Sequence, residues 1–176
     1  MRLTDAELAL LLPHIPATRG RPPADRRRTL DAIFWVALSR DPWRALPPAL
    51  GRADSAHRQL RRWARSGTLE GLLLAIAGQR HADPVAAGLT YRLCRAFRRA
   101  ARLLPLSSVL LARRLGLVDA LPCDPRFLPR PDLSEIAQKA ALVAVADPLA
   151  HPPALFRGLA RLFRLAAGRP RMWRLR

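Results

Sequence analysis

Hydrophobic residues recur at helical spacing in several stretches of the chain, and proline and glycine separate these stretches. From about residue 24 onward the apolar side chains fall three or four positions apart, at Leu30, Ile33, Phe34, Ala37 and Leu38. This spacing predicts a helix with one buried face. A shorter helix should precede it, beginning at the capping box of Thr4 and Glu7 and ending at Pro13.

The chain restarts a helical pattern at Asp41, where an aspartate that can cap a helix precedes Pro42 and Trp43. This third helix should be short, because two prolines and Gly51 follow closely. A fourth helix should begin at a cap on Asp54 or Ser55 and run to Gly67, which suits a left-handed C-cap position. A fifth should follow from Thr68 to Gly78.

The fourth predicted helix has two different faces. One face is apolar and carries Ala56, Leu60 and Trp63. The other face is basic and carries Arg58, Arg61, Arg62 and Arg65. The short third helix, a turn at Gly51 and this arginine-lined helix together match a helix-turn-helix, whose second helix enters the DNA major groove. The alternative interpretation is a solvated charged face.

The segment before the second helix offers a further DNA contact. Arg19 and Arg21 flank Gly20, and such a segment can follow a narrow minor groove, where arginine is attracted by the negative potential. The alternative is a flexible basic linker.

Composition narrows the class of partner. The 176 residues carry a net charge of +18, and all of the basic residues except Lys139 are arginine. Such a charge points to a polyanion, either nucleic acid or an anionic membrane surface. The two cysteines, Cys94 and Cys123, lie far apart and argue against a disulfide scaffold or a zinc site. With no apolar run that could cross a bilayer, we expect a cytoplasmic, nucleoid-associated protein.

Several short motifs together resemble a known family. They are Leu3-Thr4-Asp5-Ala6-Glu7, Arg19-Gly20-Arg21-Pro22, Asp25-Arg26-Arg27, Asp31-Ala32-Ile33, Pro42-Trp43-Arg44-Ala45-Leu46-Pro47, Gly51, Arg61-Arg62-Trp63 and Gly67. In order and spacing, residues 3 to 77 resemble the N-terminal DNA-binding domain of insertion-sequence transposases. The resemblance implies a small helical domain that binds the terminal DNA of the element and precedes an RNase H-like catalytic domain. It also implies that Trp43, Leu46 and Trp63 hold the helices together.

The sequence departs from the family pattern around the fourth helix. Ala53-Asp54 stands where the family often has Pro-Trp, and smaller residues replace its usual aromatic ones at Ala56-His57 and Leu60. The candidate DNA-binding residues are Arg19, Arg21, Ser55, His57, Arg58, Arg61, Arg62 and Arg65. The expected partner is double-stranded DNA, contacted mainly at its phosphates.

The second part of the chain lacks the pattern of the family's catalytic domain. The resemblance predicts three metal-binding carboxylates, the first on a strand soon after residue 80. The acids there are Asp83, Asp119, Asp124, Asp132, Glu135 and Asp147, and no β-branched strand pattern surrounds them. His14, His57, His81 and His151 also lack metal-ligand spacing. We therefore expect no enzyme activity, no catalytic residues, no metal and no cofactor.

Residues 80 to 176 instead predict helices joined by a proline-rich linker at 117 to 132. The first helix, from about Pro84 to Leu104, should bury Tyr91, Cys94, Phe97, Ala101 and Leu104 beside a row at Arg92, Arg95, Arg99 and Arg102. Ser107 or Ser108 should cap the next helix, and two more should span 133 to 146 and 154 to 167. About two thirds of these residues are Ala, Leu, Arg or Pro.

This narrow composition favours a frame-shifted remnant with helical tendency but without a single packed fold. The competing interpretation is a second DNA-binding or dimerisation unit. The last helix, basic and amphipathic and followed by Trp173, also supports an alternative function as a binder of anionic membrane surfaces.

The sequence thus predicts an all-α protein with a helix-turn-helix-like domain at 1–79 and a helical, partly irregular extension at 80–176. The predicted function is that of a DNA-binding protein derived from a truncated insertion-sequence transposase, with element ends as candidate targets. A separate catalytic chain or a second copy of the protein are further candidate partners. The alternatives are membrane-surface binding and an inert remnant of a decayed element.

Overall fold

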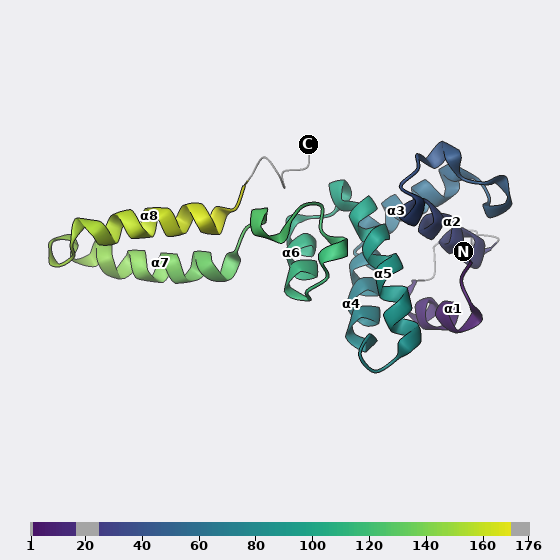
Figure 1. Ribbon diagram of the computed structural model, residues 1–176, viewed down its shortest axis with the longest axis horizontal. Helices are drawn as coiled ribbons and strands as arrows, with labels where there is room; N and C mark the ends of the chain where they lie inside the picture. Colours follow the sequence, from purple (N-terminus) through teal and green to yellow (C-terminus); the bar gives the residue numbers. More distant parts are fainter. Residues whose placement is uncertain (1, 17–24, 170–176) are drawn as a thin grey trace. The chain divides into compact units, whose positions relative to one another are not determined.

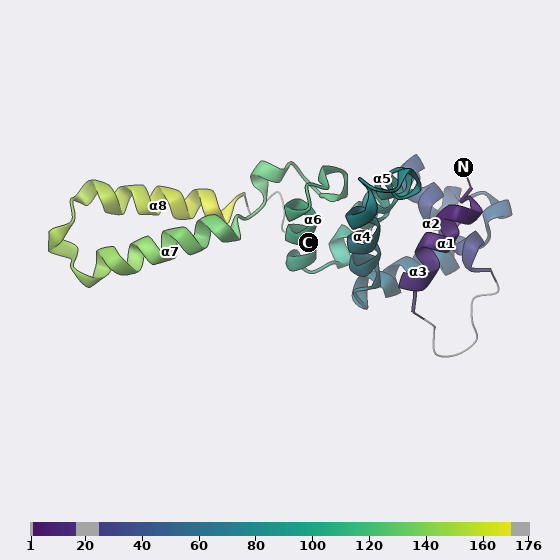
Figure 2. The ribbon, with the colours of Figure 1, turned by 90° about the horizontal axis from the view of Figure 1, so that it is seen from below.

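The computed structural model describes residues 2–16 and 25–169, and the regular structure of these residues is entirely helical (Figures 1 and 2). The α-helices are α1 (Asp5–Leu11), α2 (Arg26–Ser39), α3 (Ala53–Arg65), α4 (Thr68–Gln79), α5 (Pro84–Arg99), α6 (Leu106–Arg114), α7 (Pro131–Ala146) and α8 (Pro153–Ala167). One or two 3₁₀ turns lie in most of the connections. The all-α fold class predicted from the sequence is confirmed.

The chain forms two compact units, Met1–Pro122 and Cys123–Arg176. The first unit extends well past the predicted boundary at residue 79, because α5 packs against both α2 and α4. Its core includes Leu72 and Ile76 of α4 and Leu89, Leu93 and Phe97 of α5, all of which are almost fully buried. Residues 80–122 are therefore part of the first packed unit, and the hypothesis that the extension lacks a single packed fold fails for them.

A buried ion pair joins α1 to α5 within the first unit. The predicted capping box of α1 is present, with the Glu7 amide donating to Thr4 Oγ1 at 3.2 Å and the Thr4 amide donating to Glu7 Oε2 at 2.9 Å. The same Glu7 Oε2 accepts a hydrogen bond from Arg92 Nη1 of α5 at 3.1 Å. Both side chains are only 9% exposed. The carboxylate that caps α1 is thus held by a residue of α5.

Two predicted helix starts differ from the structure. The helix expected at Asp41 is replaced by two 3₁₀ turns, η2 (Trp43–Ala45) and η3 (Pro48–Leu50), because the closely spaced prolines interrupt helical hydrogen bonding. The next helix, α3, begins two or three residues earlier than a cap on Asp54 or Ser55 would allow. Its N-cap is Arg52, whose carbonyl oxygen already accepts the Ser55 and Ala56 amides.

The buried face of α5 also differs from the prediction. Tyr91 is 50% exposed, whereas Arg92 and Arg95 are buried. The reason is that α5 packs against several elements at once, so its buried surface is wider than one stripe. The start of α6 is likewise changed, because Pro105 is its N-cap and the Ser108 hydroxyl instead hydrogen-bonds the Glu70 carboxylate of α4.

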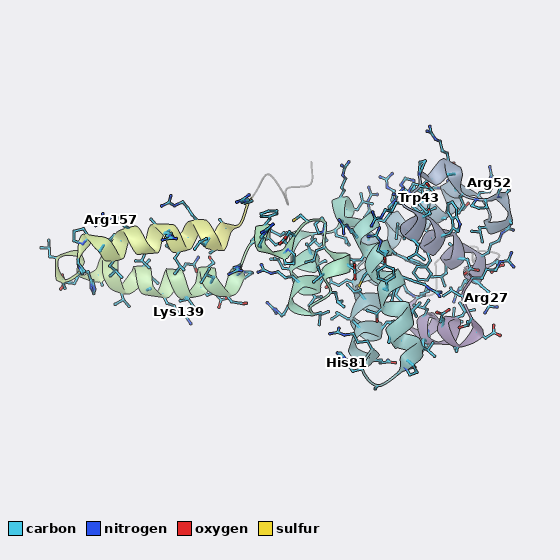
Figure 3. The ribbon with its side chains drawn as sticks, in the orientation of Figure 1. Arg27, Trp43, Arg52, His81, Lys139 and Arg157 are labelled. Atoms are coloured by element: carbon cyan, nitrogen blue, oxygen red, sulfur yellow. The ribbon has the colours of Figure 1, made fainter. Side chains whose placement is uncertain are left out.

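The second unit is an antiparallel hairpin of α7 and α8 (Figure 1). Its seam contains Ala137 and Ala144 of α7 and Leu159 and Ala166 of α8, which are buried and spaced seven residues apart on each helix. Small residues at this spacing let two helices pack closely along their length. Lys139 of α7 and Arg157 of α8 lie on opposite outer sides of the hairpin (Figure 3). The two predicted helices are confirmed.

We expect Arg92→Met to lower the free energy of unfolding by about 3–5 kcal/mol, because it leaves the Glu7 carboxylate buried without its partner. Chemical denaturation followed by circular dichroism measures the change. Arg114→Met, at an exposed position of α6, is the matched control and should have little effect. Adding Glu7→Gln to Arg92→Met should recover part of the loss, and a simple sum of the two single effects would contradict the coupling.

Gly67 separates α3 from α4 and has a φ of +75°, as predicted for a left-handed C-cap. Because an added Cβ would meet nothing within 4 Å, Gly67→Ala should reduce stability through backbone strain alone, by about 1 kcal/mol. Gly71→Ala, inside α4 and equally unobstructed, should increase stability by about 0.5–1 kcal/mol. Equal effects of the two substitutions in thermal melts would contradict this assignment.

Candidate nucleic-acid interface

Helix α3 is fixed by its apolar face and exposes its basic face. Ala56, Leu60 and Trp63 are buried, as the sequence predicts, and α3 packs against α2 and α4. The opposite side carries Arg58, Arg61, Arg62 and Arg65, which we call the α3 arginine face. Of these four residues, only Arg61 is partly buried, and the others are exposed. The rigid packing of one side of the helix therefore presents four guanidinium groups on the other.

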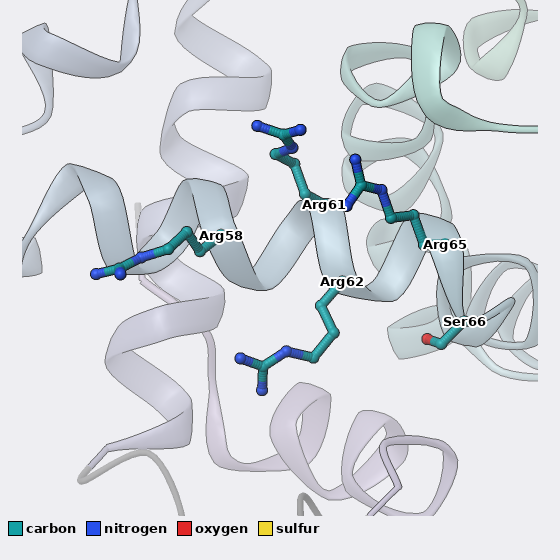
Figure 4. A pocket seen from close by; sticks show the side chains of 5 residues that line it. All are labelled: Arg58, Arg61, Arg62, Arg65 and Ser66. Carbon is teal, nitrogen blue, oxygen red and sulfur yellow. The ribbon is translucent and has the colours of Figure 1, made fainter.

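The α3 arginine face lines an open hollow of about 620 Å³, to which Ser66 also contributes. Figure 4 shows Arg61 and Arg65 extending to one side of the helix, Arg62 to the other, and Arg58 toward the N-terminal end. No acidic residue lines this hollow. The side chains thus spread along a surface that attracts anions and do not converge on one point.

The charges of this face have no ion-pair partner in the part of the chain that the structure describes. Among the described residues, the ion pairs are Arg27–Asp5, Arg92–Glu7 and Arg126–Asp124, and none involves the α3 arginine face. Asp54 lies one turn before Arg58, whose Nε donates to the Asp54 carbonyl oxygen at 3.3 Å. The Asp54 carboxylate suits the positive end of the helix dipole, and it makes the first turn of α3 less attractive to a polyanion than the later turns.

Arg61 differs from the other three arginines of this face in the environment of its Nε atom. Its Nε atom is buried without a hydrogen-bond partner, although the side chain as a whole is only half-buried. A buried donor without a hydrogen-bond partner costs free energy, so a side chain that lacks the Nε–H group would make the fold more stable.

The remaining predicted site residues are placed differently. Ser55 is exposed on the first part of α3, outside the hollow, and His57 packs its ring 5.1 Å from that of Trp43. Arg19 and Arg21 lie outside the described residues. Ser66, which directly follows the last residue of α3, also lines the hollow and was not predicted.

The helix-turn-helix predicted for this region is not present in the expected form. Its first helix was expected between Asp41 and the turn at Gly51, and the structure has only the 3₁₀ turns η2 and η3 in that place before α3. The residues expected to hold the helices together behave differently from one another. Leu46 and Trp63 are buried, whereas Trp43 is half-buried and contacts His57 and Arg99.

Other candidate chemistry is sparse in the part of the chain that the structure describes. No group of three or more His, Cys, Asp or Glu side chains there is placed to hold a metal ion. Burial, with a smaller contribution from Asp119, raises the pKa of the Cys94 thiol to about 11, so it stays protonated and a poor nucleophile near neutral pH. Among the same residues, no helix has both the length and the hydropathy needed to cross a bilayer.

Comparison with known proteins confirms the resemblance seen in the N-terminal part. Residues 3–73 match the family described as "Putative transposase of IS4/5 family (DUF4096)". A curated protein of Sinorhizobium fredii (strain NBRC 101917 / NGR234), named "Uncharacterized protein y4sN", is 38% identical over 68 residues, which are 38% of this chain and 53% of that protein. The chain thus spans about half the length of this relative. No solved structure matches.

The unsatisfied Nε of Arg61 gives a prediction for stability. Arg61→Met keeps the length of the side chain and removes the donor, so we expect the free energy of unfolding to rise by about 1 kcal/mol. Arg62→Met, at an exposed position of the same helix, is the control and should change stability little. Urea denaturation of both variants measures the difference. A loss of stability specific to Arg61→Met would contradict the reading of this position.

Proposed function

We propose that this protein binds double-stranded DNA and that the α3 arginine face is its main contact surface. The observation that carries the proposal is the hollow of about 620 Å³ lined by four arginines and a serine, with no acid among its lining residues. Guanidinium groups form paired hydrogen bonds with phosphate oxygens, so such a surface suits a phosphate backbone.

The arrangement of the charges supports an extended polyanion over a small anion. The four side chains are spread along the outside of one helix and point in different directions (Figure 4). A duplex presents about one negative charge per 1.7 Å of its axis, so a row of separate cations can each meet a phosphate. The family match over residues 3–73 supports the same class of ligand, since transposases act on DNA.

The alternative of a membrane surface has weaker support. Its basis was the amphipathic helix that the structure shows as α8. Within the second unit, Leu159 and Ala166 of the apolar side of α8 are buried in the seam with α7. Leu155 and Phe163 of the same side are each 37% exposed, so the hairpin covers this side only in part.

We expect neutralisation of the α3 arginine face to weaken DNA binding and its salt dependence together. In the full chain, replacing Arg58, Arg61, Arg62 and Arg65 by Gln should lower the slope of log K against log salt by about 3–4, because four phosphate contacts are lost. Fluorescence anisotropy with a labelled duplex over a salt series measures the slope.

The matched control removes four charges elsewhere. Lys139, Arg157, Arg161 and Arg164 are exposed on the hairpin, and their replacement by Gln should leave the slope close to that of the unmodified protein. Circular dichroism should show that both variants stay folded. DNA binding that is unchanged in the α3 variant, or no binding by the unmodified protein, would overturn the proposal.

We further propose that the preferred duplex is the terminal DNA of an insertion element, as the family match suggests. The full chain should bind a duplex with the terminal repeat more tightly than a shuffled duplex, and the gap should persist as salt rises. Equal affinity at every salt concentration would reduce the function to contact with the DNA backbone.

A further inference from the structure

A second group of arginines lies beside α3 on a segment outside the family match. The last turn of α5 and the following 3₁₀ turn η4 (Ala101–Leu103) carry Arg98, Arg99 and Arg102, which are exposed. We call these three residues the α5 arginines. They belong to the same compact unit as α3 but lie beyond residue 73, where the family match ends.

A chain of contacts connects this group to α3. Arg99 Nη2 donates to the carbonyl oxygen of Asp41 at 2.8 Å, and its guanidinium carbon lies 5.9 Å from the centre of the Trp43 ring. The Trp43 ring in turn lies 5.1 Å from the ring of His57 on α3. In addition, η4 packs directly against α3. The α5 arginines therefore lie next to the helix that carries the proposed DNA contact.

The contacts also show which side of α3 the second group adjoins. His57 and Arg61 are one helical turn apart, so they share one side of α3. Because His57 contacts Trp43, this is the side toward Arg99. Arg61 and Arg65 extend to the same side of the helix in Figure 4, while Arg62 extends to the other. Arg99 of the second group thus lies toward the side of α3 that carries Arg61.

The α5 arginines retain their charge for an external anion. Residues 98 to 102 contain no acid, and none of the three arginines forms an ion pair with another described residue. The partners of Arg99 are a carbonyl oxygen and an aromatic ring, which orient the guanidinium without neutralising it.

We infer that the α5 arginines extend the DNA-binding surface beyond the segment that resembles transposases, by contacting phosphates of the same duplex. This inference rests on the proposed function of α3. It assigns a role to named residues after residue 79, a part of the chain for which the sequence left open both a frame-shifted remnant and a second DNA-binding or dimerisation unit. The ligand group is the DNA phosphate, so the contribution is to affinity and not to the choice of sequence.

The test compares two variants of the full chain that lose equal charge. Arg98→Gln, Arg99→Gln and Arg102→Gln together should lower the salt slope of duplex binding by up to about 3. Arg157→Gln, Arg161→Gln and Arg164→Gln together remove three exposed charges from α8, and this control should keep the slope of the unmodified protein. Equal losses in the two triple variants would overturn the inference, because they would show only an effect of net charge.

A second variant separates contact with DNA from support of the fold. Arg99 holds Asp41 and Trp43, so its loss could disturb α3 indirectly. The double variant Arg98→Gln and Arg102→Gln keeps Arg99, and we expect its salt slope to fall by about 2 with an unchanged melting temperature. An unchanged slope in this double variant would overturn the inference.

The outcome also distinguishes this inference from the proposed function. If the unmodified chain does not bind the duplex, the proposed function fails, and the inference fails with it. If the chain binds and the α3 variant weakens binding while the α5 variants do not, only the inference fails. If the α3 variant and the α5 variants all bind more weakly while the α8 control binds normally, the two groups of arginines form one continuous surface.

Discussion

The first unit depends on a carboxylate that serves two helices at once. Glu7 completes the capping box of α1 and also pairs with Arg92 of α5, 85 residues further along the chain. A buried charge without a partner is strongly unfavourable, so neither α1 nor α5 can adopt its place without the other. The segment that resembles transposases and the segment that follows it therefore form one folding unit. The pair is one reason why the compact unit continues past residue 73, where the family match ends.

The same constraint divides the arginines into two classes. Arg92 and Arg95 lie inside, where the first balances a carboxylate and the second leaves its Nε without a partner. The arginines of α3 and of the end of α5 lie at least partly at the surface, and none of them forms an ion pair with another described residue. The net charge of +18 is thus not spread over the surface alone, because part of it lies in the interior.

Features with a local physical cause could be predicted from the sequence. The capping box at Thr4, the left-handed Gly67 and the two faces of α3 depend on neighbouring residues only, and all three are present. Features that depend on contacts between distant parts of the chain could not be predicted in this way. The sequence gives no sign that Arg92 meets Glu7, that Tyr91 is exposed, or that Arg61 has a buried Nε, because each depends on which helix packs alongside. The missing helix at Asp41 shows that a good cap cannot compensate for closely spaced prolines.

The loop of the hairpin constrains how two copies of the chain could combine. Exchange of α8 between copies would require α7 and α8 to merge into one long helix across residues 147–152. Pro148, Pro152 and Pro153 follow one another closely in this stretch and lack the amide hydrogens that a continuous helix needs. Each hairpin is thereby biased to close on itself, and any association of copies must use surfaces that exist in the closed form.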